Sequence, residues 1–176
     1  MKLLSFIGSL LIIGSASAAD ITIYYSPTCP HCHHARAFID NELVYEYKTI
    51  KVNAANVMEP ENLTSFRDAL EKCDYDTGGV PLIIIGKKCF QGYGPKMNQD
   101  LRDAVSVDLS DKEKSDAVAN MKLFQENPEK FRAENSDRAN AVSEIGQSTQ
   151  KKTEDGTVIY FYILLGVLVA GLGFVL

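Results

Sequence analysis

The sequence predicts an α/β domain with a partly parallel sheet, and two observations carry this prediction. Strand-like and helix-like stretches alternate from residue 20 to about residue 106. A β-rich run at 21–25 is followed by a helical pattern at 33–43 and by a second strand-like run at 45–52. This order of elements is a βαβ unit, and its two strands are expected to be parallel.

The later elements of the domain have signals of their own. Pro60 suits the first turn of a helix, for which we expect an apolar face formed by Leu63, Phe66, Leu70 and Cys73. Strands at 82–85 and 88–91 flank Gly86-Lys87, which predicts a hairpin with a type II′ turn. A short final helix is expected around Leu101 and Val105. The sheet should therefore have four strands.

Length and charge limit what the protein can be. The chain has 176 residues, enough for one core. Lys and Arg total 18 against 23 for Asp and Glu, and no stretch concentrates positive charge. A nucleic-acid partner needs such a basic surface, so binding to DNA or RNA is disfavoured.

The first 18 residues have the pattern of a signal peptide. Lys2 precedes an apolar run, and Ala16 and Ala18 fit the cleavage positions. The run is short for an uncleaved anchor, the alternative interpretation. We therefore expect cleavage after Ala18 and export of the mature chain.

A second apolar segment, residues 158–176, contains no charged residue and no proline. As a helix it would span about 28 Å, enough to cross a bilayer. It predicts a transmembrane anchor. The alternatives are a tail that is removed on attachment of a glycolipid and a buried core helix.

Residues 107–157 are dense in charge and sparse in apolar side chains. Ser110 and Glu113 can cap a helix carrying Val118, Met121 and Phe124, and Asn127-Pro128 can begin another around Phe131. Because this segment cannot build a core of its own, we interpret it as a partly helical, solvated stalk between the domain, residues 20–106, and the membrane.

The chemistry is concentrated in Cys29-Pro30-His31-Cys32, between the first strand and the first helix. At a helix start, Cys29 faces free backbone N–H groups, which favour the thiolate that attacks disulfides. Cys32, one turn further on, can then resolve the mixed disulfide. His31 can add positive charge, and Pro30 suits the first helical turn.

Gly79-Val80-Pro81 precedes the buried strand at 82–85, and a cis bond before Pro81 is plausible at a strand start. With the CxxC motif, these residues resemble the thioredoxin superfamily, and the stretches 24–32 and 77–81 resemble its glutaredoxin-sized members. The resemblance implies a thioredoxin/glutaredoxin-like fold and a protein thiol-disulfide oxidoreductase. It also implies that Cys29 lies beside a cis-Pro81 and that the Val80 backbone pairs with an extended substrate.

Two departures refine the resemblance. The tetrapeptide Cys-Pro-His-Cys is also that of the DsbA oxidases, but too few residues separate Cys32 from Pro81 for the helical domain that DsbA inserts there. Gly92-Tyr93-Gly94-Pro95 stands where glutaredoxins usually have a Gly-Gly pair followed by acidic residues that hold glutathione. No cofactor is expected beyond the Cys29–Cys32 disulfide itself, and glutathione is doubtful.

Other interpretations of the same residues exist. Cys29-x-x-Cys32-His33 is also the attachment signature of c-type haem, and the cysteines with His31, His33 and His34 form a set of metal-binding residue types. On a helix these side chains point in different directions, so we predict no metal and treat His33 and His34 as solvated. A redox-inactive interaction module is the remaining alternative.

Cys73 and Cys89 are predicted to form a structural disulfide, because Cys73 ends the helix expected to cover the face on which Cys89 lies. Two separate thiols or a second redox pair are the alternatives.

An anchored, exported redox protein suits the bacterial periplasm and its inner membrane, with client proteins and a membrane redox partner. The eukaryotic secretory pathway is the alternative, in which Asn62-Leu63-Thr64 is a glycosylation sequence. His31 within the CxxC motif, Cys29 at a helix start and export to a disulfide-forming compartment together favour an oxidase or isomerase. The alternative is a reductase, which the small glutaredoxin-like body and the membrane tether also suit.

Overall fold

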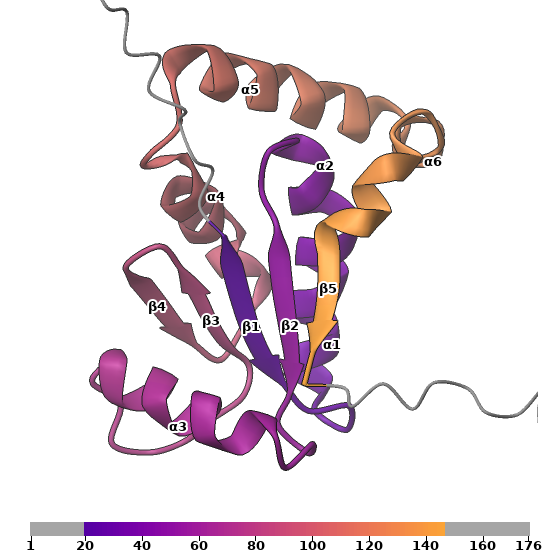
Figure 1. Cartoon of the computed structure of the whole chain (residues 1–176). Coiled ribbons are helices and arrows are strands. Elements are labelled where there is room, and N and C mark those ends of the chain that lie inside the picture. The colour runs from indigo at the N-terminus through magenta and orange to yellow at the C-terminus, as the bar shows by residue number, and fades with distance from the viewer. Residues whose placement is uncertain (1–19, 147–176) are drawn as a thin grey trace, which may run out of the picture. The chain divides into compact units, whose positions relative to one another are not determined.

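A mixed five-stranded sheet organises residues 20–146, the part of the chain that the computed structural model describes (Figure 1). The strand order is β4-β3-β1-β2-β5. Strand β1 is parallel to β2 and antiparallel to β3, and β2 is parallel to β5. The strands are β1 (Ile21–Tyr25), β2 (Val52–Asn56), β3 (Leu82–Ile85), β4 (Lys88–Gln91) and β5 (Val142–Ile145).

Helices cover both faces of this sheet. A π-helical turn, Ile39–Leu43, joins α1 to α2, and short 3₁₀ turns precede α4 and β5. Figure 1 shows α3 on the opposite face of the sheet from α1 and α4. The helices are α1 (Pro30–Phe38), α2 (Val44–Glu46), α3 (Asn62–Lys72), α4 (Asn98–Ser106), α5 (Asp111–Glu126) and α6 (Pro128–Glu134).

Each face of the sheet has its own apolar cluster, because successive side chains of a strand point to opposite faces. Ile21 and Ile23 are fully buried among residues of α1, α2 and α4. Tyr24, the residue after Ile23, packs on the other face with Leu70 of α3 and Leu82 of β3. Strand β3 is therefore apolar on both faces, whereas β1 presents Ile21 and Ile23 to one face and Tyr24 to the other.

The hairpin of β3 and β4 has the predicted bounds, with Cys89 paired opposite Ile84. Gly86 has φ +58°, in the left-handed region that a type II′ turn requires at its first central residue. The helix α3 buries Leu70 and half-buries Phe66, as expected, but Leu63 is exposed.

The predicted strand at 45–52 is wrong over most of its length. The chain stays helical to Glu46, and β2 begins only at Val52. Ile39, Leu43 and Val44 continue the buried face of α1 and are fully buried, so packing in the core overrides the strand preference of the β-branched and aromatic residues.

The interpretation of residues 107–146 as a solvated stalk is also wrong, because these residues are part of the domain. The predicted helices exist: Ser110 and Glu113 form a capping box for α5, and α6 begins at Pro128. However, Phe124 and Phe131 are each only 6% exposed and belong to the main core. Strand β5 adds a fifth strand beside β2.

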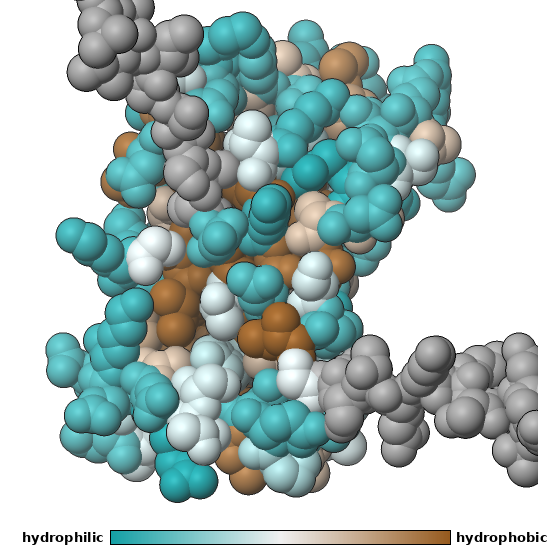
Figure 2. Space-filling model, viewed as in Figure 1, coloured by the Kyte–Doolittle hydropathy of each residue, from teal (hydrophilic) through white to brown (hydrophobic). Residues whose placement is uncertain are grey.

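Few apolar residues suffice for this docking because α2 supplies the surface against which they pack. The rings of Tyr45 and Phe124 lie 6.5 Å apart, and those of Phe124 and Phe131 lie 6.3 Å apart in an edge-to-face arrangement. The charged side chains of the segment lie on the outside, because most of the visible surface of α5 and α6 is hydrophilic (Figure 2).

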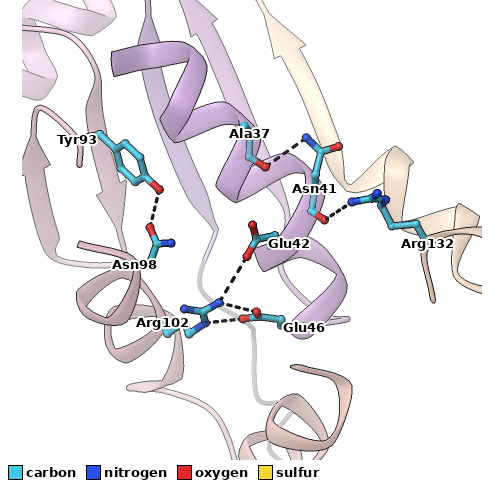
Figure 3. A network of polar contacts seen from close by, with 8 residues as sticks. All are labelled: Ala37, Asn41, Glu42, Glu46, Tyr93, Asn98, Arg102 and Arg132. Carbon is cyan, nitrogen blue, oxygen red and sulfur yellow. Dashed lines mark hydrogen bonds and ion pairs between the residues drawn. The ribbon is translucent and has the colours of Figure 1, made fainter. Parts of the chain in front are cut away.

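Polar contacts add to this attachment. The Arg138 guanidinium donates hydrogen bonds to the carbonyl oxygens of Val44 (3.0 Å) and Ile50 (2.8 Å), so it caps backbone groups that follow α1. Figure 3 shows a second network, in which Arg102 of α4 makes a bidentate ion pair with the buried Glu46 carboxylate. These contacts join α2 to α4 and to the residues before β5.

Three expectations fall outside the described residues: the signal peptide at 1–18, the end of the predicted stalk at 147–157, and the apolar segment at 158–176. Within residues 20–146, no helix has both the length and the apolar character needed to cross a bilayer. Asn62 is described and is 3% exposed, with its amide nitrogen donating to the carbonyl oxygens of Asn56 (2.9 Å) and Ile145 (3.1 Å). This amide is already bonded and buried, so Asn62 is not accessible for glycosylation in the folded protein.

Candidate active site

The loop from β1 to α1 positions the Cys29-Cys32 pair. Ser26 is buried, and its Oγ accepts a hydrogen bond from the backbone N–H of Thr28 (3.3 Å). Its carbonyl oxygen accepts a second one from the backbone N–H of Cys29 (3.1 Å). Ser26 thus fixes a tight turn at the end of β1, and the sequence analysis missed this role although Ser-Pro-Thr is a turn-forming sequence.

Cys29 is the N-cap residue of α1, with an extended backbone, and Pro30 occupies the first helical turn. The Sγ atom of Cys29 accepts a hydrogen bond from the backbone N–H of Cys32, with 3.2 Å between N and Sγ. Cys29 is partly exposed. A sulfur atom at this position receives the free N–H groups and the positive end of the helix dipole, both of which favour a thiolate.

Cys32 is different, because its side chain is only 1% exposed. Burial raises the pKa of the Cys32 thiol to about 12, and its hydrogen bond with Cys29 acts in the same direction. Cys32 is therefore protonated at neutral pH, while Cys29 is the sulfur that a substrate in solution can reach.

Val80 and Pro81 lie beside the pair. The peptide bond between them is cis, and the Cys29 thiol donates to the carbonyl oxygen of Val80 over 3.6 Å. Val80 is partly exposed and Pro81 is buried. Cys29 and Val80, 51 residues apart in the sequence, thus meet where β1 ends and its neighbour β3 begins.

The histidines do not converge on the cysteines. His31, His33 and His34 are all exposed, and Nε2 of His33 lies 2.7 Å from the carbonyl oxygen of Pro27. In the part of the chain that the structure describes, no three His, Cys, Asp or Glu side chains gather in a way that could hold a metal ion.

The C-terminal strand reaches the active-site helix. Glu144 of β5 accepts a hydrogen bond from the Tyr25 hydroxyl (2.8 Å) and pairs with Arg36 of α1 (2.8 Å). Burial and Glu144 raise the pKa of Tyr25, so this phenol stays protonated as the donor. A strand that the sequence analysis had not predicted thereby contacts both elements that flank the Cys29 loop, through Tyr25 at the end of β1 and Arg36 in the last turn of α1.

The other two cysteines are joined to each other. Cys73 ends α3, Cys89 lies in β4, and a disulfide connects them with 5.9 Å between their Cα atoms. Cys29 and Cys32 are free thiols in this structure.

The fold and the paired cysteines define a thioredoxin-like redox domain, and comparison with known proteins gives a narrower description. Residues 21–90 match the family model of glutaredoxin. The crystal structure of a glutaredoxin from Archaeoglobus fulgidus is similar to this chain, with 18% sequence identity and a TM-score of 0.39, and the match covers 57% of this chain and 98% of that one. Among curated proteins, none matches the chain. Residues 21–90 are thus a glutaredoxin-like part of a thioredoxin-superfamily fold, and α4, α5, α6 and β5 lie beyond the matched segment.

Proposed function

We propose that this protein is a thiol-disulfide oxidoreductase in which Cys29 reacts with client proteins and Cys32 resolves the intermediate. The observation that carries the proposal is the different setting of the two sulfur atoms. Sγ of Cys29 is accessible and accepts a backbone N–H at a helix start, whereas Cys32 is buried and has a raised pKa. The glutaredoxin-like domain supports the same class of reaction.

The exchange follows from this asymmetry. In the reducing direction, the Cys29 thiolate attacks one sulfur of a client disulfide, an S–S bond forms between Cys29 and the client, and the second client sulfur leaves as a thiolate. Cys32 then loses its proton and attacks Cys29. The Cys29–Cys32 disulfide forms, the client leaves with two thiols, and two electrons have passed to it. The oxidising direction is the reverse.

We favour the oxidising direction. His31 places a group that can be positively charged within the CxxC motif, which stabilises the reduced thiolate form and raises the reduction potential. The expected potential is about −120 to −200 mV, against about −270 mV for thioredoxin. The tetrapeptide shared with DsbA oxidases favours the same direction. Equilibration with glutathione buffers, read by alkylation of Cys29, measures this potential, and a value near the thioredoxin figure would make the protein a reductase.

The setting of the protein is part of the proposal. The signal-like N-terminus and the apolar segment at 158–176 support an exported protein anchored in the bacterial inner membrane, with client proteins and a membrane redox partner. The redox-active disulfide is its own cofactor. The Gly92-Tyr93-Gly94-Pro95 segment argues against bound glutathione, because it lacks the acidic residues with which glutaredoxins hold that tripeptide.

A trapping experiment tests the reaction. With a disulfide-containing protein such as insulin, Cys32→Ser should accumulate a mixed disulfide between Cys29 and the client, because the resolving thiol is gone. Cys29→Ser should form none and should be inactive, and Cys29→Ser with Cys32→Ser is the matched control. Formation of equal mixed disulfide by Cys29→Ser would overturn the assignment. An absorbance band of covalent haem in the purified protein would overturn the oxidoreductase itself.

A further inference from the structure

The segment between α3 and β3, residues 73–81, leads directly to Val80 and Pro81 and contains neither helix nor strand. Its conformation therefore depends on contacts with its neighbours. Three contacts join this segment to the strand β4. They are the disulfide from Cys73 to Cys89, a hydrogen bond from the Tyr75 hydroxyl to the carbonyl oxygen of Cys89 (3.4 Å), and a hydrogen bond from Nε2 of Gln91 to the carbonyl oxygen of Thr77 (2.8 Å).

Gln91 also packs against the backbone beside Val80. A Cβ atom added at Gly79 would lie 3.1 Å from Nε2 and 3.3 Å from Cδ of Gln91, so the amide side chain lies directly along this glycine. The neighbouring Gly92 donates its backbone N–H to the carbonyl oxygen of Pro81 (2.7 Å). The end of β4 thus contacts the segment on both sides of Val80.

The function of the segment makes these contacts relevant to the reaction. The Val80 carbonyl oxygen lies 3.6 Å from Sγ of Cys29, and the backbone of Val80 is the group expected to pair with an extended substrate. Because Gly78 and Gly79 give the preceding chain high conformational freedom, the alignment of Val80 with Cys29 needs support from outside the segment.

We propose that Gln91 and the Cys73–Cys89 disulfide are positioning elements that hold Thr77 to Pro81 in register, so that the Val80 backbone can pair with a polypeptide substrate while Cys29 attacks its sulfur. This inference rests on the proposed oxidoreductase function. Gln91 acts through Thr77 and Gly79, and the disulfide acts by closing a ring of chain that includes Val80. Neither group touches the reacting sulfur atoms.

The test compares two disulfide substrates on the full-length protein, with the monothiol 2-mercaptoethanesulfonate as the reductant that returns the Cys29–Cys32 disulfide to two thiols after each turnover. One is a peptide disulfide with extended chain on both sides of its cysteine, which can pair with the Val80 backbone. The other is bis(2-hydroxyethyl) disulfide, which has no backbone to pair. Gln91→Glu keeps the shape of the side chain but replaces the NH₂ donor by an oxygen, so it should lose the bond to Thr77. Loss of one or two substrate hydrogen bonds predicts a rise of about tenfold in the KM for the peptide.

The expected pattern is a split between the substrates. Gln91→Glu, and separately Cys73→Ala with Cys89→Ala, should raise the peptide KM while leaving kcat/KM for the small disulfide and the pH profile of Cys29 alkylation unchanged. Lys87→Ala, an exposed change at the other end of the same hairpin, is the matched control and should alter neither substrate.

The outcomes separate the two proposals. If the wild-type protein turns over neither disulfide, the oxidoreductase function fails. If it turns over both and the variants change both substrates equally, or change only the melting temperature, Gln91 and the disulfide are merely structural and the positioning inference is overturned. If the wild-type protein accepts only the small disulfide, substrate pairing with Val80 is wrong and the inference fails with it.

Discussion

The backbone N–H of Cys32 donates a hydrogen bond to Sγ of Cys29, so a sulfur atom fills the position that Ser, Asp or Asn usually takes at the N-terminus of a helix. This one contact links the start of α1 to the chemistry of the pair. It gives the Cys29 sulfur a backbone N–H partner, and it keeps Cys32 one turn along the helix, inside the protein, with its sulfur able to contact that of Cys29.

This relationship predicts which thiol reacts first. At neutral pH, iodoacetamide should modify Cys29 of the reduced protein and leave Cys32 unmodified, because the pKa of Cys32 is raised to about 12 and its thiol is therefore protonated far above neutral pH. Cys32 should react only when the pH approaches that value or when the protein is unfolded. Peptide mapping by mass spectrometry identifies the modified residue. Preferential modification of Cys32 in the folded protein would contradict the prediction.

The Cys73–Cys89 disulfide should contribute substantially to stability. The disulfide closes a loop with a sequence separation of 16 residues. In the chain-entropy treatment, closing a loop of this size raises the free energy of unfolding by about 3 kcal/mol. Replacing both cysteines by alanine should lower the free energy of unfolding by about that amount, read as a shift of the urea midpoint. An unchanged midpoint would mean that the contacts of Tyr75 and Gln91 alone hold the segment.

The Glu46–Arg102 pair gives a third prediction. Glu46 is 2% exposed, and the two residues form two hydrogen bonds of 2.6 and 2.7 Å (Figure 3). Arg102→Met leaves the carboxylate buried without its partner, which should cost about 3–5 kcal/mol of folding free energy. Glu46→Leu combined with Arg102→Met removes both charges and should recover most of that loss.

A matched surface pair is the control for this experiment. Lys112 and Asp116 on α5 are exposed partners, and exposed ion pairs contribute little to stability. Lys112→Met should therefore leave the unfolding midpoint unchanged. If Arg102→Met were as mild as Lys112→Met, the Glu46 carboxylate would not depend on its partner.

The parts of the fold that could be predicted from the sequence are those with local signals. Gly86 determines the two-residue hairpin turn, and this turn fixes the register of the two strands, so β3 and β4 have the predicted bounds. The Ser110 capping box likewise marks the start of α5. In each case, residues within a few positions of one another carry the information.

The errors concern features that depend on residues far apart in the sequence. Tyr45 was predicted to begin a strand, but it belongs to α2, where its ring packs against Phe124. The pairing of β5 with β2 joins residues separated by about ninety positions, and the short sequence Val142–Ile145 contains no local signal that predicts it. Gln91 was missed as a site residue for the same reason, since its bond to Thr77 exists only in the folded hairpin.

The docking of the C-terminal segment provides the last prediction, because two adjacent residues of α5 differ in exposure. Phe124 is 6% exposed and contacts the rings of Tyr45 and Phe131, whereas Leu123 is 50% exposed. Phe124→Ala should lower the free energy of unfolding by about 3–5 kcal/mol, the cost of truncating a buried phenylalanine. Leu123→Ala, on the same helix, should change it by less than about 0.5 kcal/mol. A solvated stalk would make the two variants equal in chemical denaturation, so the difference between them measures directly how far residues 107–146 belong to the redox domain.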